Sequence, residues 1–204
     1  MSDASKSIEY PTSLVEGFVL VGGRSTRFGH DKALYPIEDR PMAMRVADTL
    51  LQVVASVTLI GEPAKYRHLG LPVIADNLEA IGPLGGISTV LEESDAPWNL
   101  IVACDLLHLE RGVLERLIDC AIDTAADVVW PVTPDGRTQP LCAVYSKASS
   151  DHVKSQVEQG IRKVTDAFTE RRTLKLRFDD DRPFFNFNYV NDLAPSFKVP
   201  DNAA

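Results

Sequence analysis

The chain has 204 residues, of which 45% are hydrophobic and 25% are charged, as in an ordinary globular protein. This composition excludes a disordered chain, a fibre or a coiled coil, and no apolar run approaches the roughly 20 residues that a membrane span needs. The 21 basic and 29 acidic side chains give a net charge of −8. That balance disfavours a partner such as DNA or RNA, because coating nucleic acid requires a basic surface.

Length and cysteine content predict one domain in a reducing compartment. We expect a single domain over residues 1–204, with residues 1–11 and 200–204 as flexible tails. The first eleven residues are polar and lack the basic and then apolar profile of a signal peptide. The three cysteines show no C-x-x-C spacing, so we expect reduced thiols and a cytoplasmic protein: Cys104, Cys120 and Cys142.

Short apolar runs alternate with amphipathic segments through the first half of the chain. Gly17–Val21 reads as a buried strand that ends at Gly22-Gly23, and apolar residues recur at helical spacing from Pro41 to Val54, with Pro41 in the first turn. This alternation is typical of a parallel sheet with crossover helices. The further predicted elements are strands at Val57–Ile60, Leu71–Ile74 and Leu100–Ala103, a helix from the turn Ile81–Gly86 through Leu91, and a helix after Glu110.

The second half changes character. Val128–Val132 reads as a strand, and Pro140–Tyr145 follows it after a turn and can return antiparallel. Polar and apolar residues alternate from Thr173 to Phe178, which predicts a strand with one wet face. The sequence therefore predicts a single-domain, three-layer αβα fold, Rossmann-like, with a mostly parallel sheet and a mixed antiparallel part in its second half.

The segment Val21–Lys32 directly follows the first predicted strand. Its glycines allow the backbone to approach phosphate oxygens closely and to turn N–H groups toward them. Neither the Walker spacing nor G-x-G-x-x-G fits the segment, and a glycine-rich surface turn with solvated arginines is the alternative to phosphate binding. Phosphate binding is favoured, because cations and hydroxyls gather here in an acidic chain: Arg24, Arg27, Lys32, Ser25 and Thr26.

Asp105 follows the most apolar predicted strand, so its carboxylate should lie at the same sheet edge as the glycine segment. A carboxylate there suits Mg²⁺, which keeps several waters and bridges one or two carboxylates to substrate phosphates. The alternative is that Asp105 caps the next helix. Taken alone, the residue favours neither interpretation.

Two amides flank Phe187. Alternation along the chain places Asn186 and Asn188 on one face, with Phe187 pointing into the core. A polar pair on an edge strand or in a turn is the more common meaning of such a pattern. Asp76 and the Gly82–Gly86 segment likewise read as turns when considered alone.

In their order along the chain these segments resemble the molybdenum cofactor guanylyltransferase (MobA) family within the nucleotidyltransferase group. That family opens with L-A-G-G-x-S-x-R-M-G-x-D-K, which residues 20–32 match with Val21 for alanine and Phe28 for methionine. The similarity runs roughly from residue 17 to 193. Its later landmarks are a G-P-L-x-G loop after an aspartate, a C-D pair after a strand, and N-x-N before D-L: Gly82–Gly86 after Asp76, Cys104-Asp105, Asn186–Asn188 and Asp192-Leu193.

The resemblance implies roles for the matched residues. Leu20, Val21 and Gly22 would line the nucleotide site, and Gly23 with the rest of the segment would wrap the phosphates. On the nucleotide side, Lys32, Arg24 and Arg27 would stabilise charge on the triphosphate, and Asp105 would hold a Mg²⁺ ion. Further nucleotide contacts would come from Asp76, Gly82 and Pro83. On the acceptor side, Asn186 and Asn188 would face molybdopterin, and Arg162 and Lys163 would bind the pterin phosphate.

The implied activity is transfer of GMP from GTP to molybdopterin, with release of pyrophosphate. Guanine is preferred because the Asp76 carboxylate can accept from its N1–H and N2–H₂ edge, which cytosine does not offer. The alternatives are a molybdopterin cytidylyltransferase or another nucleotidyltransferase, and a non-catalytic module that carries a nucleotide or molybdopterin. Acceptor molybdoenzymes or other cofactor-biosynthesis proteins are further candidate partners, whereas nucleic acid and membranes are not expected.

The chain departs from the family pattern at two places. The family has a proline two residues after the motif aspartate, where this chain has Leu107 within Leu106–Leu109, so the turn beyond Asp105 can differ while the carboxylate stays. After the second strand the family presents a polar residue, whereas this chain has Ile60-Gly61. A nucleotide contact there would come from the backbone or be missing, which affects base selectivity more than the chemistry.

Overall fold

The computed structural model describes residues 10, 13–22, 31–76, 78, 81–188 and 192. Gly23, Arg24 and Arg27 of the predicted phosphate segment lie outside the described residues, as do Ser25, Thr26 and most of the two predicted tails. The positions of these side chains therefore stay predictions.

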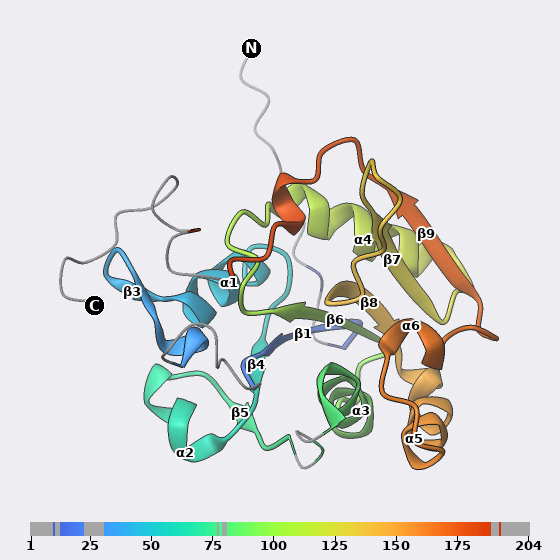
Figure 1. The fold of residues 1–204 in the computed structure, drawn as a ribbon, viewed down its shortest axis with the longest axis horizontal. Helices are drawn as coiled ribbons and strands as arrows, with labels where there is room; N and C mark the ends of the chain where they lie inside the picture. Colours follow the sequence, from blue (N-terminus) through green and yellow to red (C-terminus); the bar gives the residue numbers. More distant parts are fainter. Residues whose placement is uncertain are drawn as a thin grey trace.

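A seven-stranded sheet runs through the centre of the described chain in the order β5-β4-β1-β6-β8-β7-β9 (Figure 1). Six of these strands are mutually parallel, and β8 runs antiparallel to both of its neighbours. The predicted mostly parallel sheet with an antiparallel part in the second half is confirmed. The strands are β1 (Val15–Leu20), β4 (Val57–Ile60), β5 (Val73–Ile74), β6 (Trp98–Ala103), β7 (Val128–Val132), β8 (Cys142–Ser146) and β9 (Thr173–Arg177).

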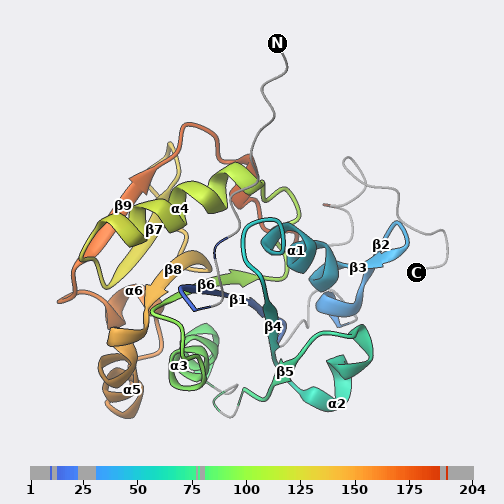
Figure 2. The same cartoon turned by 180° about the vertical axis from the view of Figure 1, so that it is seen from behind.

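Helices cover both faces of this sheet, which gives three layers (Figures 1 and 2). One face is covered by α1 (Met42–Leu50) and α4 (Arg111–Asp123). The other is covered by α3 (Pro83–Glu93), α5 (Ser150–Glu158) and α6 (Val164–Ala167). Beyond the β4–β5 side lie the short helix α2 (Pro63–Tyr66) and a small hairpin of β2 (Pro36–Ile37) and β3 (Arg40–Pro41).

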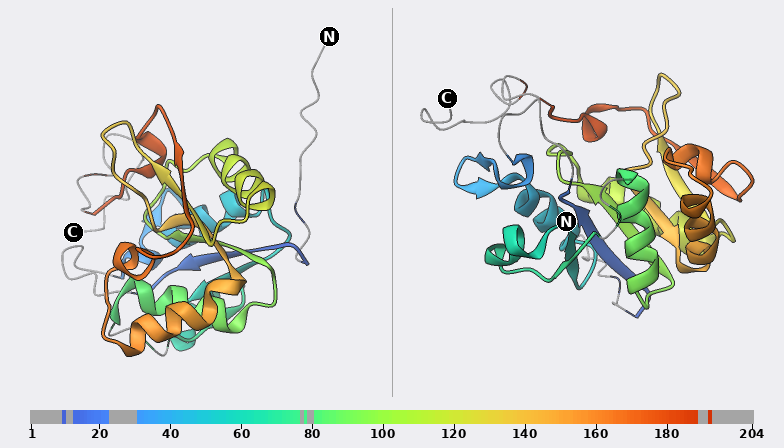
Figure 3. Two further views of the ribbon diagram at one scale, coloured as in Figure 1. Left: turned by 90° about the vertical axis from the view of Figure 1, so that its right-hand side faces the viewer. Right: turned by 60° about the horizontal axis from the view of Figure 1, so that its bottom comes forward.

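Alternation along the buried strands divides the core in two. In β1, Val15 and Val19 pack with the α1 and α4 side, whereas Phe18 and Leu20 pack with the α3 side. Successive side chains of a strand point to opposite faces, so a strand covered on both sides is apolar throughout. The views of Figure 3 show the two helical layers separated by the sheet. None of the helices formed by the described residues is long and apolar enough to cross a membrane.

Several predicted boundaries differ from the structure. Pro41 is not in the first helical turn: it ends β3 and is the N-cap of α1. That helix stops at Leu50 and residues 51–53 form turns, because the backbone of Val53 and Val54 pairs with Tyr10: the carbonyl of Val53 accepts from the N–H of Tyr10, and Val54 forms a β-bridge with it. The predicted strand at 71–74 keeps only Val73–Ile74, since Leu71 and Pro72 precede the paired residues.

Candidate active site

The strand order reverses between β1 and β6. The chain leaves β1 toward β4 and β5, then returns on the other side of β1, where Leu20 pairs with both Ile60 of β4 and Ala103 of β6. In open α/β sheets, ligands bind beyond the carboxyl ends of the strands at such a switch point. The residues that follow β1 and β6 are therefore the first place to look for a site.

A cavity of about 190 Å³ lies at this switch point. Residues from the ends of β1, β4 and β6 line it together with the start of α3. The structure thus brings together residues up to 85 positions apart that the sequence analysis singled out: Leu20, Val21, Gly22, Lys32, Asp76, Gly82, Pro83 and Asp105. Ile60, the last residue of β4, also lines this cavity.

The centre of the cavity wall is an ion pair. Lys32 Nζ donates to Asp105 Oδ2 over 2.7 Å, and the two side chains are only 13% and 16% exposed. Lys32 begins a 3₁₀ turn, Lys32–Leu34, whose N-cap is Asp31. Asp105 lies in the turn after β6, and α4 begins only at Arg111 with Glu110 as its N-cap. The alternative that Asp105 caps this helix is therefore wrong.

The two oxygens of Asp105 differ. Oδ2 accepts from Lys32, whereas Oδ1 is buried and has no hydrogen-bond partner among the described residues. A buried carboxylate oxygen without a partner is costly unless a cation or donor reaches it. The described residues contain no group of three or more His, Cys, Asp and Glu that could hold a metal ion. The buried, unpartnered Oδ1 of Asp105 fits a hard cation such as Mg²⁺, which takes one or two carboxylates, waters and substrate phosphates.

Asp76 and the start of α3 also line this cavity. Asp76 follows β5, and its Oδ1 accepts from the backbone N–H of Leu78 over 2.9 Å. Gly82, the N-cap of α3, has a φ of 82°, a conformation that glycine adopts without strain. A Cβ at Gly86 would lie 3.1 Å from Leu20 Cδ2 and 3.6 Å from Asp76 Oδ2. The helix start is thus packed tightly against β1, and Gly82, Pro83 and Gly86 line the cavity there.

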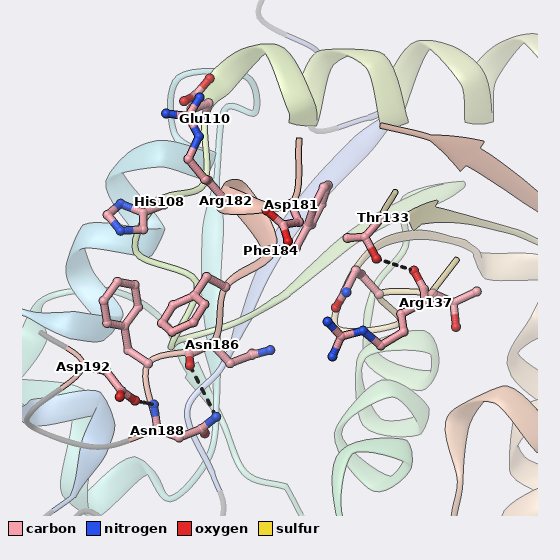
Figure 4. Close-up of a pocket in the computed structure, with 14 residues that line it drawn as sticks. His108, Glu110, Thr133, Arg137, Asp181, Arg182, Phe184, Asn186, Asn188 and Asp192 are labelled. Carbon is pink, nitrogen blue, oxygen red and sulfur yellow. Dashed lines mark hydrogen bonds between the residues drawn. The ribbon is translucent and has the colours of Figure 1, made fainter. Parts of the chain in front are cut away.

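A second cavity of about 740 Å³ is lined by Asn186 and Asn188. Both residues are exposed while Phe187 between them is fully buried, so the predicted alternation is confirmed, although the segment is not a strand. In Figure 4, Asn186 and Arg137 face one another from opposite walls. Asn188 Oδ1 also accepts from Lys32 Nζ over 3.1 Å, which links the two cavities.

The turn beyond Asp105 is held by apolar packing in the absence of the family's proline. Leu106 and Leu109 are buried in the core, and the N–H of Leu109 bonds to the carbonyl of Leu106 over 3.2 Å. His108 packs edge-on against Phe187, whose N–H donates to the carbonyl of Asp105 over 3.2 Å. The late amide segment is thereby fixed directly against the Asp105 turn.

A third cavity, of about 1080 Å³, contains the predicted basic residues Arg162 and Lys163, both of them exposed. It shares Pro83 and Leu141 with the first cavity and Arg137 with the second. The sequence analysis missed Arg137, because residues 134–136 indicated only a turn. Tyr66 was missed too, because it is the buried residue of a four-residue helix that contains no recognisable motif.

Fold and site together define an α/β nucleotide-binding protein with a lysine–aspartate pair at its switch point. Comparison with known proteins gives a narrower class. A sequence model of the MobA-like NTP transferase domain matches residues 17–173. The chain belongs to this family.

Its relatives cover almost the whole chain. A molybdenum cofactor guanylyltransferase of Cupriavidus taiwanensis is 32% identical over 187 residues, which cover 88% of this chain and 94% of the relative. One of Ralstonia nicotianae is 32% identical over 196 residues, 90% and 96% of the two chains. The fold is similar to the crystal structure of molybdopterin-guanine dinucleotide biosynthesis protein A from Archaeoglobus fulgidus, with a TM-score of 0.74, 22% identity and coverage of 88% and 95%.

Proposed function

We propose that the chain transfers GMP from GTP to molybdopterin and releases pyrophosphate. The observation that carries this proposal is the Lys32–Asp105 pair in a cavity at the switch point of the sheet. The relatives named molybdenum cofactor guanylyltransferase support the choice of substrates.

This reaction needs no nucleophile from the protein, because the terminal phosphate of molybdopterin attacks the α-phosphorus of GTP. Cys104 lines the nucleotide cavity, but burial raises the pKa of its thiol well above the ordinary range, and the neighbouring Asp105 carboxylate adds to that rise. The thiol therefore stays protonated and weakly nucleophilic. What the chain must supply is alignment of two anions and positive charge where negative charge develops.

Lys32 supplies that charge from a fixed position. An ammonium group has three N–H donors, and two of them already bond to Asp105 and Asn188. The ammonium group, held in place by these two bonds, would stabilise negative charge on the triphosphate, and the N-terminal end of α3, where Gly82 and Pro83 line the cavity, would add to this effect. Asp105 would hold Mg²⁺ through its buried Oδ1. The ion, when bound, supplies Lewis-acid polarisation of the phosphates and a template for their geometry.

The second and third cavities would receive the acceptor. Asn186 and Asn188 offer amide donors and acceptors to a pterin, and Arg162 and Lys163 offer cations to its phosphate. The acceptor phosphate then reaches the nucleotide from the Leu141 and Asn188 side, because these residues adjoin both regions. Asp76, which lines the nucleotide cavity, would accept from the N1–H and N2–H₂ groups of guanine.

The test is pyrophosphate release by the purified chain with molybdopterin, Mg²⁺ and each of GTP, CTP, ATP and UTP. We expect turnover with GTP at least about tenfold above turnover with the other nucleotides, the discrimination of roughly one or two base-edge hydrogen bonds. Faster turnover with CTP would identify a cytidylyltransferase and contradict the assignment of guanine. GTP binding without pyrophosphate release would instead identify a carrier module.

A further inference from the structure

A buried tyrosine lies behind the nucleotide cavity, at the end of the short helix α2. Tyr66 is 3% exposed, and its hydroxyl oxygen lies 2.8 Å from the carbonyl oxygen of Val21 and 2.8 Å from Oδ2 of Asp31. The hydroxyl has a single proton for these two acceptors. Tyr66 therefore joins the residue that follows β1 to the residue that precedes Lys32.

Asp31 uses its two oxygens for different purposes. Oδ1 accepts from the N–H of Ala33 over 3.1 Å and so caps the 3₁₀ turn Lys32–Leu34, while Oδ2 faces Tyr66. The carboxylate thus fixes the start of the turn on which Lys32 is the first residue. A shift of Asp31 would shift the backbone of Lys32 and, with it, the ammonium group beside Asp105.

The ring of Tyr66 has little freedom to move. Gly61, which follows β4, lies against it: a Cβ at Gly61 would be 2.9 Å from Tyr66 Cε2 and 2.7 Å from Val21 Cγ2. Real Cβ atoms do not approach this closely, so only glycine lets the ring reach the end of β1. Gly61 is therefore part of the packing that fixes the position of Tyr66.

We propose that Tyr66 is a positioning residue for Lys32. Its hydroxyl, acting through Asp31, sets the turn that carries Lys32, and through the Val21 carbonyl it ties this turn to the end of β1. Tyr66 lines none of the three cavities, so its effect on GTP would pass through Lys32. The proposal rests on the proposed function, since it assumes that Lys32 binds the triphosphate of GTP.

The test is a double-mutant cycle on GTP binding, measured by titration calorimetry with Mg²⁺. Tyr66→Phe keeps the ring and removes the hydroxyl, and we expect its Kd for GTP to rise about tenfold, or about 1.4 kcal/mol. Lys32→Ala weakens binding by itself. If Tyr66 acts through Lys32, adding Tyr66→Phe to Lys32→Ala has no further effect, whereas independent effects would multiply.

Tyr10→Phe is the matched control. Tyr10 is also buried, and its hydroxyl also donates to a carboxylate, that of Asp119, but it precedes β1 and so lies at the opposite end of the strand. We expect this variant to bind GTP as the wild type does. A loss in Tyr10→Phe equal to that in Tyr66→Phe would show general destabilisation and overturn the positioning role.

Asp31→Ser tests the same link from its other end. Serine is also a good N-cap, so the turn keeps its cap, but the short hydroxyl does not reach Tyr66. We expect the same rise in Kd, with no addition when Tyr66→Phe is combined with it. If the wild type binds GTP and Tyr66→Phe and Asp31→Ser bind it equally well, the positioning role of Tyr66 is overturned and the proposed function is not. Failure of the wild type to bind GTP overturns the proposed function as well.

Discussion

At the scale of single residues, the two oxygens of Asp105 stand in contrast. One accepts from Lys32, and the other is buried without a partner among the described residues. Replacing Asp105 by asparagine separates the bond to Lys32 from the binding of a cation. Asparagine has nearly the same shape and retains an oxygen that can accept from Lys32, but it carries no negative charge. A neutral amide is a much poorer ligand for Mg²⁺ than a carboxylate.

We expect Asp105→Asn to lower kcat for GMP transfer by about 10²–10³-fold, the effect of losing one group that stabilises charge in a transition state. The melting temperature of the variant should equal that of the wild type, since the side-chain volume and the bond to Lys32 are kept. Pyrophosphate release at increasing Mg²⁺ measures the effect. Asp95→Asn, an exposed carboxylate after α3, is the control. Wild-type turnover in Asp105→Asn would remove this residue from the metal site.

At the scale of elements, the start of α3 shows why glycine occurs inside a helix. A Cβ at Gly85 would lie 2.4 Å from the carbonyl oxygen of Leu78, and one at Gly86 would lie 3.1 Å from Leu20 Cδ2. Gly112, in the first turn of α4, has nothing within 4 Å of the same position. The three glycines differ only in what surrounds them, and this makes them a matched set.

We expect the three alanine variants to separate stability from binding. Gly112→Ala should raise the free energy of unfolding by about 0.5–1 kcal/mol, because alanine favours helices. Gly85→Ala should lower it by about 1–3 kcal/mol through overpacking. Gly86→Ala should raise the KM for GTP about tenfold with kcat nearly unchanged, as expected for a narrowed pocket. Urea unfolding and steady-state kinetics give the two readouts, and a stable, fully active Gly85→Ala would contradict the packing argument.

At the scale of the whole molecule, the elements with a clear hydrophobic period were predictable from the sequence. The long helices and the buried strands β1, β6 and β7 carry many apolar residues at regular spacing. The meeting of Lys32 with Asp105 was also predictable, although 73 residues separate them, because both follow parallel strands at one sheet edge. The predicted parallel arrangement of the strands was therefore enough to predict that Lys32 and Asp105 meet.

Two residues near the site, Tyr66 and Arg137, could not be predicted, because the short elements that carry them have no hydrophobic period. Helix α2 has four residues with one buried side chain, Tyr66, and the β2–β3 hairpin has two residues in each strand. Helix α5 buries only Val153 and Val157. Arg137 reaches two cavities from a turn whose path depends on tertiary contacts, so nothing local in the sequence marks it.

Ligand binding by the whole molecule should be visible in its melting temperature. GTP with Mg²⁺ at about 100 times its Kd stabilises the folded state by about 2.7 kcal/mol, which raises the Tm of a chain of this size by about 5–10 °C. CTP at the same concentration should raise it less, because only guanine offers Asp76 two donors. Removal of Mg²⁺ with a chelator should reduce the shift. Equal shifts with GTP and CTP would contradict selection of the base by Asp76.

In the seven-stranded sheet of the described residues, β8 alone is reversed, and this has a consequence for how such a molecule can diversify. Because β8 runs against its neighbours, the connection from Val132 to Cys142 turns back at the ligand edge and brings Arg137 and Leu141 to the cavities. This hairpin is separate in sequence from every element around Lys32 and Asp105. Because Leu141 also lines the nucleotide cavity, it is changes confined to the turn around Arg137 that can alter which acceptor is admitted while Lys32 and Asp105 stay as they are.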